Sequence, residues 1–379
     1  MTHYKKCLGE NLVVYRGYDK KVYALDAYCK HMGANLGVGG AVKNTNCVEC
    51  PFHGWIYDGE TGKCLAGNGK EARVADVYEY HDIKRVIKKD GCFFRKVGEE
   101  EVKVRTWVVV EKHHQLFLWY HPDESKRTTP LFELLDLSKS FSHLDYRGYG
   151  HNVLNNHLHE ILENTGDYLH FHYVHGQLIN KSDLIRFVWD MRWKPAEDPK
   201  LEEYMECSGK RQDKYRKDIL REFINEKNKE YFSINGLENS ISFPILGLSH
   251  YFFTGTAIHV GPSVVYFFFR SPVYDLVLSI TSLPVDKYKQ DFVVTLFCNK
   301  GLPYWLTAQI IYFEIGQISN DGLVWDQKIN PERIYYNKFG PYDKFFIDWR
   351  NFYAKFFVDS YKKEEEQKEK VSNEKKLEW

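Results

Sequence analysis

The sequence of 379 residues has no excess of charge of either sign, because 52 Lys and Arg residues balance 52 Asp and Glu residues. A protein that binds nucleic-acid phosphates needs a basic surface, so this balance argues against nucleic acid as a partner. Cysteine is also sparse, with 8 residues in the chain. That number is too low for a disulfide scaffold and favours a reducing compartment, where clustered cysteines are first considered as metal ligands.

Long apolar runs are missing as well. The sequence contains no stretch of about 18 apolar residues, and its first ten residues are polar, so it indicates neither a membrane span nor a signal peptide. The longest uncharged stretch, residues 250–269, contains two glycines and a proline and predicts two strands around a turn. Hydrophobic residues make up 43% of the chain, which is an ordinary globular balance and excludes wholesale disorder.

Short alternating patterns predict that the first part of the chain is rich in strands. Residues 11–16 and 22–25 are β-like pieces separated by turn residues. Two stronger runs, 107–110 and 116–120, predict a hairpin that closes a first domain. The polar segment 122–130 then has the composition of a linker.

The rest of the chain mixes helical and strand patterns. Residues 157–175 and 305–318 have helical composition, whereas β-branched and aromatic runs over 233–297 predict an antiparallel sheet. The highly charged segment 200–229 predicts an exposed helix or an insertion, and 362–376 predicts a solvated tail.

Two short segments each contain one cysteine and one histidine: Cys29 with His31, and Cys50 with His53. In a Rieske [2Fe–2S] centre two thiolates hold one iron and two imidazoles hold the other, so such mixed pairs are required. A zinc site is the weaker alternative, because its pairs are usually two cysteines followed by two histidines. Cys47 lies close to the second pair, but its spacing does not fit either site.

A second cluster of candidate ligands contains Asp167, His170 and His175. Mononuclear non-haem Fe(II) sites use two histidines and one carboxylate. Residues five apart point about 140° away from each other on a regular helix, so both histidines can bind one metal only if the helix is distorted or ends, with Gly176 as the terminator. Asp167 shares a face with His170. Three nearby histidines are expected to be surface or packing residues: His157, His159 and His172.

Together these patterns resemble the Rieske oxygenase family. The sequence Cys-Lys-His-Met-Gly-Ala-Asn-Leu at 29–36 and the sequence Cys-Pro-Phe-His-Gly-Trp-Ile-Tyr at 50–57 match its two cluster loops, and the Asp-x2-His-x4-His spacing at 167–175 matches its iron-binding pattern. The gap between the loops and the charged stretch 77–105 are longer than is usual in the family. The resemblance covers residues 11–328 and is closest to the cholesterol 7-desaturase (Neverland-type) group.

The resemblance implies an α+β fold. A β-rich Rieske [2Fe–2S] domain is expected at residues 1–121. A catalytic mononuclear iron domain of the helix-grip type, an antiparallel sheet around a long helix, is expected at 122–361, and a charged C-terminal tail at 362–379.

It also implies the roles of the second cluster. By resemblance, His170 and His175 bind Fe(II), while Asp167 hydrogen-bonds one of them and bridges to His53 of a neighbouring subunit in a homotrimer. The family's third ligand is a distant carboxylate.

For that third ligand we choose Asp321. It follows an apolar stretch and precedes Trp325 and Lys328 in a pattern that resembles the steroid-acting branch of the family. Asp326 is the competing candidate, and a surface acid is the alternative without function.

The activity implied by the resemblance is an oxidation by O2. Electrons from NAD(P)H would pass through a partner reductase to the [2Fe–2S] cluster and on to Fe(II), and the substrate would be a sterol, desaturated from cholesterol at C7–C8 to 7-dehydrocholesterol. Three alternatives stay open: reaction at another sterol position, such as C-24 side-chain dealkylation; 3-ketosteroid 9α-hydroxylation; and a Rieske electron-transfer protein without oxygenase activity.

The expected location is intracellular. Members of the desaturase group usually carry an N-terminal transmembrane helix, which this sequence does not contain. Three explanations stay open: the protein docks on membranes such as the endoplasmic reticulum in another way, the sequence is truncated, or the protein has become soluble.

Overall fold

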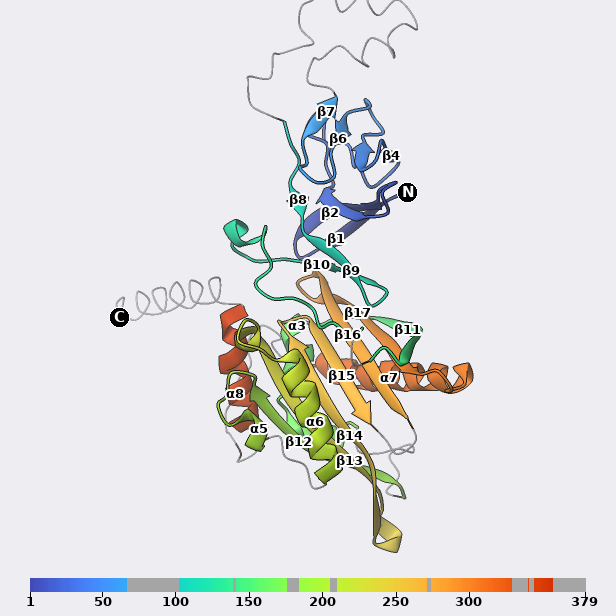
Figure 1. Ribbon diagram of the computed structural model, residues 1–379, viewed down its shortest axis with the longest axis vertical. Coiled ribbons are helices and arrows are strands. Elements are labelled where there is room, and N and C mark those ends of the chain that lie inside the picture. The colour runs from blue at the N-terminus through green and yellow to red at the C-terminus, as the bar shows by residue number, and fades with distance from the viewer. Residues whose placement is uncertain are drawn as a thin grey trace, which may run out of the picture. The chain divides into compact units, whose positions relative to one another are not determined.

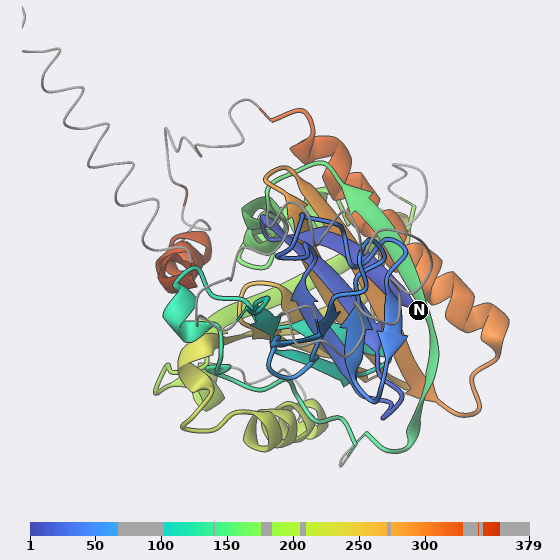
Figure 2. The ribbon, with the colours of Figure 1, turned by 90° about the horizontal axis from the view of Figure 1, so that it is seen from above.

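The computed structural model describes residues 1–66, 102–138, 141–175, 184–204, 210–270, 274–328, 340 and 344–356 (Figures 1 and 2). The chain divides into two compact units, Met1–Leu131 and Phe132–Trp379. The domain limits expected at 121/122 and 361/362 stay predictions. The charged tail, Gly176 and most of the segment 77–105 lie outside the described residues.

The first unit is built from short antiparallel strands. One sheet has the order β1-β2-β3-β8, formed by Thr2–Cys7, Glu10–Arg16, Val22–Asp26 and Thr106–Trp107. A second has the order β4-β5-β6-β7, formed by Ala41–Lys43, Cys47–Glu49, Ile56–Tyr57 and Cys64–Ala66. A separate hairpin joins β9 and β10, which are Val109–Lys112 and Gln115–Leu118.

The pieces expected at 11–16 and 22–25 are confirmed as strands, and so is the hairpin. Their alternating apolar residues, such as Val13 and Leu25, enter a core that also contains Cys29 and Cys50. The polar N-terminus is a strand that the sequence did not indicate. Only the two ends of β1 are buried, because it lies at the edge of its sheet and can carry polar side chains on its open side.

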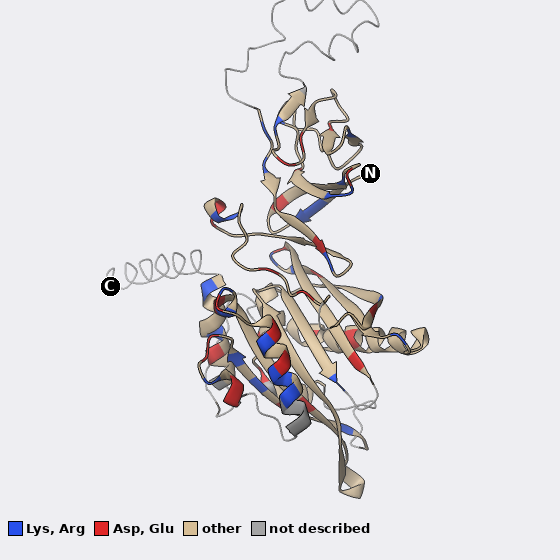
Figure 3. Ribbon diagram, viewed as in Figure 1, with Lys and Arg blue, Asp and Glu red and all other residues tan. Residues whose placement is uncertain are grey.

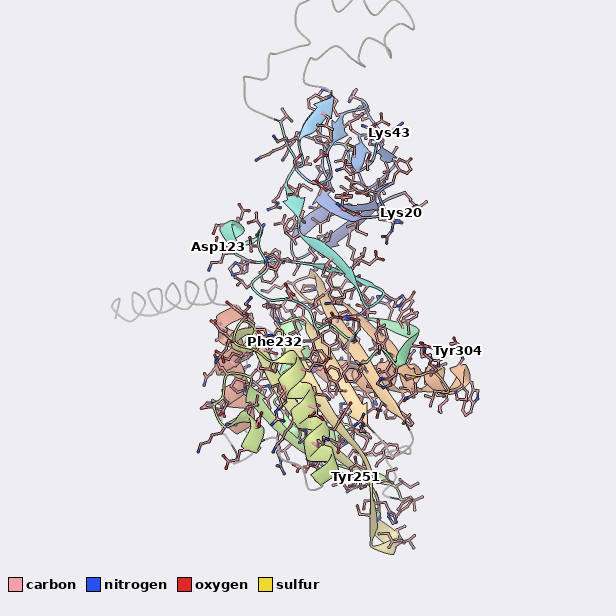
Figure 4. All side chains as sticks on the ribbon, viewed as in Figure 1. Lys20, Lys43, Asp123, Phe232, Tyr251 and Tyr304 are labelled. Carbon is pink, nitrogen blue, oxygen red and sulfur yellow. The ribbon has the colours of Figure 1, made fainter. Side chains whose placement is uncertain are left out.

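The second unit contains a seven-stranded antiparallel sheet with the order β11-β17-β16-β15-β14-β13-β12. In chain order its strands are Leu144–Leu154, Arg186–Pro195, Phe232–Phe243, Leu248–Val260, Val264–Arg270, Asp275–Asp286 and Lys289–Asn299. The uncharged stretch 250–269 forms most of β14 and β15, which pair around Gly261 as expected. Phe232, labelled in Figure 4, is fully buried at the start of β13.

Helices cover both faces of this sheet (Figures 1 and 2). The α-helices are α3 Leu158–Glu163, α4 Tyr168–Tyr173, α5 Leu201–Tyr204, α6 Lys210–Phe223, α7 Tyr304–Trp325 and α8 Lys344–Tyr353. Short 3₁₀ turns occur at Glu124–Lys126, Lys229–Tyr231, Pro244–Leu246 and Ala354–Phe356. Helix α6 packs on one face and the long helix α7 on the other.

Helix α7 approaches the sheet at Gly150 of β11. A Cβ atom at this position would lie 2.7 Å from side-chain atoms of both Ile311 and Ile315, so glycine allows the helix to lie directly on the strand. An antiparallel sheet with a long helix on it is the expected arrangement, and the α+β fold class is confirmed.

The expectation of an exposed helix or an insertion at 200–229 needs correction. Helix α6 has charged residues on its outer side (Figure 3), but Tyr215, Ile219, Leu220 and Phe223 are buried against the sheet. Each buried side chain of this size contributes roughly 1.5–3 kcal/mol to stability. Helix α6 is therefore amphipathic: its few apolar residues share one face, which the high overall charge of the segment did not indicate.

Across the described residues, the structure contains no helix that combines the length and the apolar character needed to span a membrane.

Candidate functional site

The two cluster loops, residues 29–36 and 50–57, bring their four candidate ligands into two pairs. Cys29 and Cys50 are 3% and 2% exposed and belong to the core of the first unit. His31 and His53 are exposed, and their ring centroids lie 4.6 Å apart. Two buried sulfurs beside two exposed imidazoles match a two-iron cluster with sulfur ligands on the inner iron and nitrogen ligands on the outer iron.

Both loops are tight turns of the same kind. The Gly33 amide donates to the Cys29 carbonyl at 2.9 Å, and the Gly54 amide donates to the Cys50 carbonyl at 3.1 Å. These glycines have φ values of 73° and 67°, a left-handed conformation that other residues adopt only at a cost. In each loop the residue four positions after the cysteine must adopt this conformation, and in both loops that residue is glycine.

Tyr57 and Trp55 complete the surroundings of the cluster ligands. The Tyr57 hydroxyl lies 3.1 Å from the Cys29 Sγ atom and accepts the Lys30 amide at 3.0 Å. The Trp55 ring stacks on His31 with centroids 4.7 Å apart and an interplanar angle of 5°. Tyr57 was missed as a functional residue, although it is the last residue of the second loop. Its contact with Cys29, which lies 28 positions away in the sequence, appears only in the folded chain.

The electrostatics of the loops favour metal binding. Burial raises the pKa of the Cys50 thiol, and partial burial together with His53 lowers the pKa of His31. Neutral imidazoles are the form that binds metal, and a metal compensates for the cost of burying thiolates. The four side chains therefore fit a [2Fe–2S] cluster. Cys47 lies on β5, where its thiol contacts the Asn46 side chain at 3.5 Å.

In the second unit, His170, His175 and Asp321 come together. One ligand atom from each lies within 4.8 Å of the others. The His175 Nε2 atom is 3.2 Å from Asp321 Oδ1, and the two imidazole centroids are 5.2 Å apart. We call these three residues the triad. Two histidines and one carboxylate can hold Fe(II) and leave other coordination positions open.

Helix α4 explains how both histidines reach one point. It begins at Asp167, whose Oδ1 accepts the Leu169 and His170 amides at 3.0 and 3.2 Å, and it ends at Val174. His175 therefore lies past the helix end, which is one of the two arrangements that its spacing from His170 allowed, although the helix ends before the expected terminator Gly176. The expected helical region 157–175 is divided into α3 and α4, with Asp167 as the N-cap of the second helix.

Each triad histidine has its Nδ1 atom next to an oxygen. The His170 Nδ1 is 2.6 Å from the Asp167 backbone oxygen, and the His175 Nδ1 is 2.6 Å from the Gln317 Oε1 atom. Burial lowers the pKa of His170 to about 4, so this ring is neutral at pH 7. Nδ1–H donation to an oxygen leaves the Nε2 lone pair available for a metal.

Helix α7 contributes the carboxylate and two further polar side chains. Asp321 is 4% exposed and lies within the helix, whereas Asp326 is exposed at its C-cap. Gln317 and Glu314 lie one and two turns before Asp321. Burial raises the pKa of Glu314 to about 7, and the nearby His175 opposes the rise. Neither Gln317 nor Glu314 was found from the sequence.

The other histidines of the region have different surroundings. His157 caps α3, where its Nδ1 accepts the His159 amide at 3.2 Å. The His159 Nε2 lies 2.6 Å from Glu163 Oε1. His172 is half-buried on α4 and is not part of the triad.

Aromatic side chains lie beside the triad. The Phe171 ring is 5.5 Å from His175 and 5.3 Å from Trp189, which in turn is 5.8 Å from Phe253. Other aromatic residues of the same strands do not lie beside the triad, because Phe232 and Phe268 pack on the opposite face of the sheet, in the core with α6. The alternation of side chains along each strand separates the two sets.

Comparisons with known proteins identify the family of this chain. A Rieske [2Fe-2S] domain family model matches residues 2–80, and a 3-ketosteroid 9alpha-hydroxylase C-terminal domain model matches residues 118–357. The chain belongs to the Rieske oxygenase family. This Rieske oxygenase is 26% identical to a cholesterol 7-desaturase of Hemicentrotus pulcherrimus over 99% of this chain and 69% of that protein. It is 33% identical to a probable 3-ketosteroid-9-alpha-monooxygenase oxygenase component of Rhodococcus rhodochrous, over 46% of this chain and 37% of that protein.

A solved structure supports the fold of this Rieske oxygenase. The QL mutant of NdmA from Pseudomonas putida CBB5, with theobromine, matches with a TM-score of 0.57 and 16% identity, over 92% of this chain and 82% of that one. The chain covers only part of the cholesterol 7-desaturases that it matches: across seven of them, the covered share of the relative's length ranges from 38% to 69%.

Proposed function

We propose that this Rieske oxygenase desaturates a sterol, converting cholesterol to 7-dehydrocholesterol by removing hydrogen at C7 and C8. The observation that carries the proposal is the triad of His170, His175 and Asp321 in a chain that also has the paired Cys and His loops. The similarity to cholesterol 7-desaturases over nearly the whole chain supports the choice of substrate.

Each cofactor would have its own set of side chains. Cys29, Cys50, His31 and His53 would hold the [2Fe–2S] cluster, and the triad would hold Fe(II). When bound, the cluster supplies single electrons and the mononuclear iron supplies the O2 chemistry that breaks C–H bonds.

The protein's own residues position these groups and shield the reaction. His175 and Asp321 are buried and His170 is half-buried, so water has limited access to the reacting centre. Phe171 and Trp189 offer flat apolar surfaces to a sterol, which has few polar groups to anchor. The reaction balances when the sterol loses two hydrogens and one O2 takes these with two electrons and two protons to give two waters.

We further propose that the two electrons come from NAD(P)H through a partner reductase. Within a homotrimer they would cross from the cluster of one subunit to the iron of the next, at Asp167. The Asp167 Oδ1 atom caps α4 beside His170, which places a carboxylate next to a triad ligand. Membrane association near the endoplasmic reticulum would give access to the sterol pool.

Subunit mixing tests the crossing of electrons. A His53→Ala chain and a His175→Ala chain are each expected to be inactive, whereas their co-assembled mixture should regain activity because one subunit keeps the cluster and its neighbour the iron. A mixture that assembles but stays inactive would contradict the proposed route.

The experiment that tests the reaction is a sterol profile. Cells without 5,7-diene sterols would express this chain with a compatible reductase and receive cholesterol, beside cells that express His175→Ala. A 5,7-diene that appears only with the intact chain is the expected result. Unchanged cholesterol in cells that contain the coloured protein would reject cholesterol as the substrate.

One observation favours a second candidate function. The matched C-terminal family model is that of a 3-ketosteroid 9alpha-hydroxylase. Hydroxylation would use the same ligands, since it differs only in whether oxygen returns to the carbon that lost hydrogen. A 3-ketosteroid supplied in the same cells distinguishes the two, because a hydroxylated product would support this alternative.

A further inference from the structure

The side chain of His175 has polar contacts on both ring nitrogens, and both come from helix α7. Its Nε2 lies 3.2 Å from Asp321 Oδ1, and its Nδ1 lies 2.6 Å from Gln317 Oε1. Gln317 and Asp321 are four residues apart and therefore share one face of the helix. One helix face thus supplies a triad carboxylate and holds the opposite edge of a triad imidazole.

The Gln317 contact determines which nitrogen of His175 carries the proton. An amide oxygen can only accept a hydrogen bond, so the Nδ1 atom must be the donor. In the neutral ring the proton is then on Nδ1, and the lone pair is on Nε2, which faces the other triad residues. This is the tautomer in which His175 can bind a metal through Nε2.

The two triad histidines reach this state by different means. His170 lies in α4, and its Nδ1 is 2.6 Å from the backbone oxygen of Asp167, so the helix itself fixes its orientation. His175 lies past Val174, where α4 ends. Its Nδ1 partner is a side chain that is separated by 142 positions in the sequence. A substitution can therefore remove the partner of His175 without altering the backbone.

We propose that Gln317 is a positioning residue, which sets the tautomer and the ring orientation of His175 and so assembles the mononuclear metal site. The inference rests on the proposed function, because it assumes that the triad binds Fe(II). It gives α7 two tasks at one site: Asp321 binds the metal, and Gln317 orients a second ligand.

The neutral amide also suits the charges on this helix face. Glu314 lies three residues before Gln317, and Asp321 lies four residues after it. A carboxylate at position 317 would stand between two other acids, whereas glutamine supplies the same acceptor geometry without adding charge.

The test measures the affinity of the mononuclear site for Fe(II) by competition with a ferrous chelator, in full-length protein whose cluster absorbance is monitored. Gln317→Leu removes the acceptor and should weaken Fe(II) binding about 10- to 100-fold, the usual effect of losing such a partner. Gln317→Glu keeps an acceptor, although it adds a charge between Glu314 and Asp321, and should bind Fe(II) more tightly than Gln317→Leu. Gln309→Leu makes the same chemical change at an exposed position of α7 and should have no effect.

The results separate this inference from the proposed metal site. His175→Ala should lose the third iron, and retention of three irons by that variant would refute the ligand assignment itself. If His175→Ala loses iron but Gln317→Leu binds Fe(II) like the wild type, the role of Gln317 is refuted alone. If the Gln317→Leu variant does not fold, Gln317→Met replaces it, because methionine is unbranched and also lacks a strong acceptor. The proposal would also be overturned if Gln317→Glu bound Fe(II) as weakly as the leucine or methionine variant.

Discussion

The cluster loops and the triad bring metal-binding side chains together in different ways. The loops supply all four candidate ligands of the cluster from residues 29–53, and their two imidazoles stay exposed. The triad combines His170 of α4, His175 just past the end of that helix, and Asp321 of α7, and its members are buried or half-buried in the second unit. The first arrangement is set by local turns, whereas the second depends on the packing of a whole sheet and helix.

This difference predicts that each site can be lost without the other. The largest effect is expected for His175→Ala, because a missing imidazole leaves the triad with two ligands. The variant should contain about two iron atoms per chain instead of about three and should have no turnover, while the cluster spectrum stays intact. Iron analysis with visible spectroscopy measures both sites at once. His172→Ala, on the same helix, should keep all three irons, and a loss of the cluster in His175→Ala would contradict the independence of the sites.

Helix α7 and its C-cap offer two candidate carboxylates for the third metal ligand, Asp321 and Asp326. Asp321→Asn should lose most of the third iron, since an amide is a poor substitute for a buried carboxylate. Asp326→Asn should keep it, because Asp326 is exposed at the helix end. Iron analysis of the two purified variants gives the answer, and the opposite pattern would transfer the ligand role to Asp326.

The stability of the second unit, which contains the triad, should depend more strongly on acidic pH than that of the first unit. His259 on β14 is fully buried, and among the described residues neither of its ring nitrogens has a hydrogen-bond partner. Burial lowers its pKa to about 3. The unfolded chain therefore binds the extra proton between about pH 6.5 and pH 3, so stability falls as pH falls, by about 2 kcal/mol at pH 5.

Chemical unfolding at pH 7 and pH 5 measures this loss. His259→Phe should reduce the pH dependence, whereas His250→Phe, at an exposed position of the same strand, should leave it unchanged. An equally steep pH dependence in His259→Phe would assign the acid sensitivity to other groups.

The smallest expected effect is confined to the cluster loops. Tyr57→Phe removes the hydroxyl that lies 3.1 Å from Cys29 Sγ. A hydrogen bond to a ligand sulfur stabilises the added negative charge of a reduced cluster, so the variant should have a lower reduction potential with an unchanged iron content. A spectroscopic redox titration measures the shift, and Tyr18→Phe, at an exposed position of the same unit, is the control. Equal potentials for wild type and Tyr57→Phe would show that the hydroxyl does not tune the cluster.

The two regions also differ in how much the sequence predicted. The paired Cys29–His31 and Cys50–His53 spacing indicates a cluster directly, because the ligands are close in the chain. Helix geometry alone predicted that the helix is distorted or ends near the two histidines, with Gly176 as the terminator, and α4 ends earlier, with Val174 as its C-cap. Asp321 was chosen only through the family resemblance, since no local spacing connects it to the histidines.

Other contacts were beyond prediction for the same reason. Gln317 and Tyr57 matter through partners that reach them only in the folded chain, across 142 and 28 positions. The charged helix α6 was expected to be exposed because its apolar residues are few, yet they all lie on one side. Patterns that depend on tertiary packing were therefore the ones that the sequence did not show.

The central claim is that the triad and the cluster act together on a sterol, and a single-turnover reaction tests it most directly. Purified protein with a chemically reduced cluster and bound Fe(II) would receive cholesterol and O2, without a reductase. The wild type is expected to form 7-dehydrocholesterol, and His175→Ala, whose cluster is equally reduced, is expected to form none. Formation of the 5,7-diene by His175→Ala, or its absence in fully loaded wild type that binds cholesterol, would contradict the account.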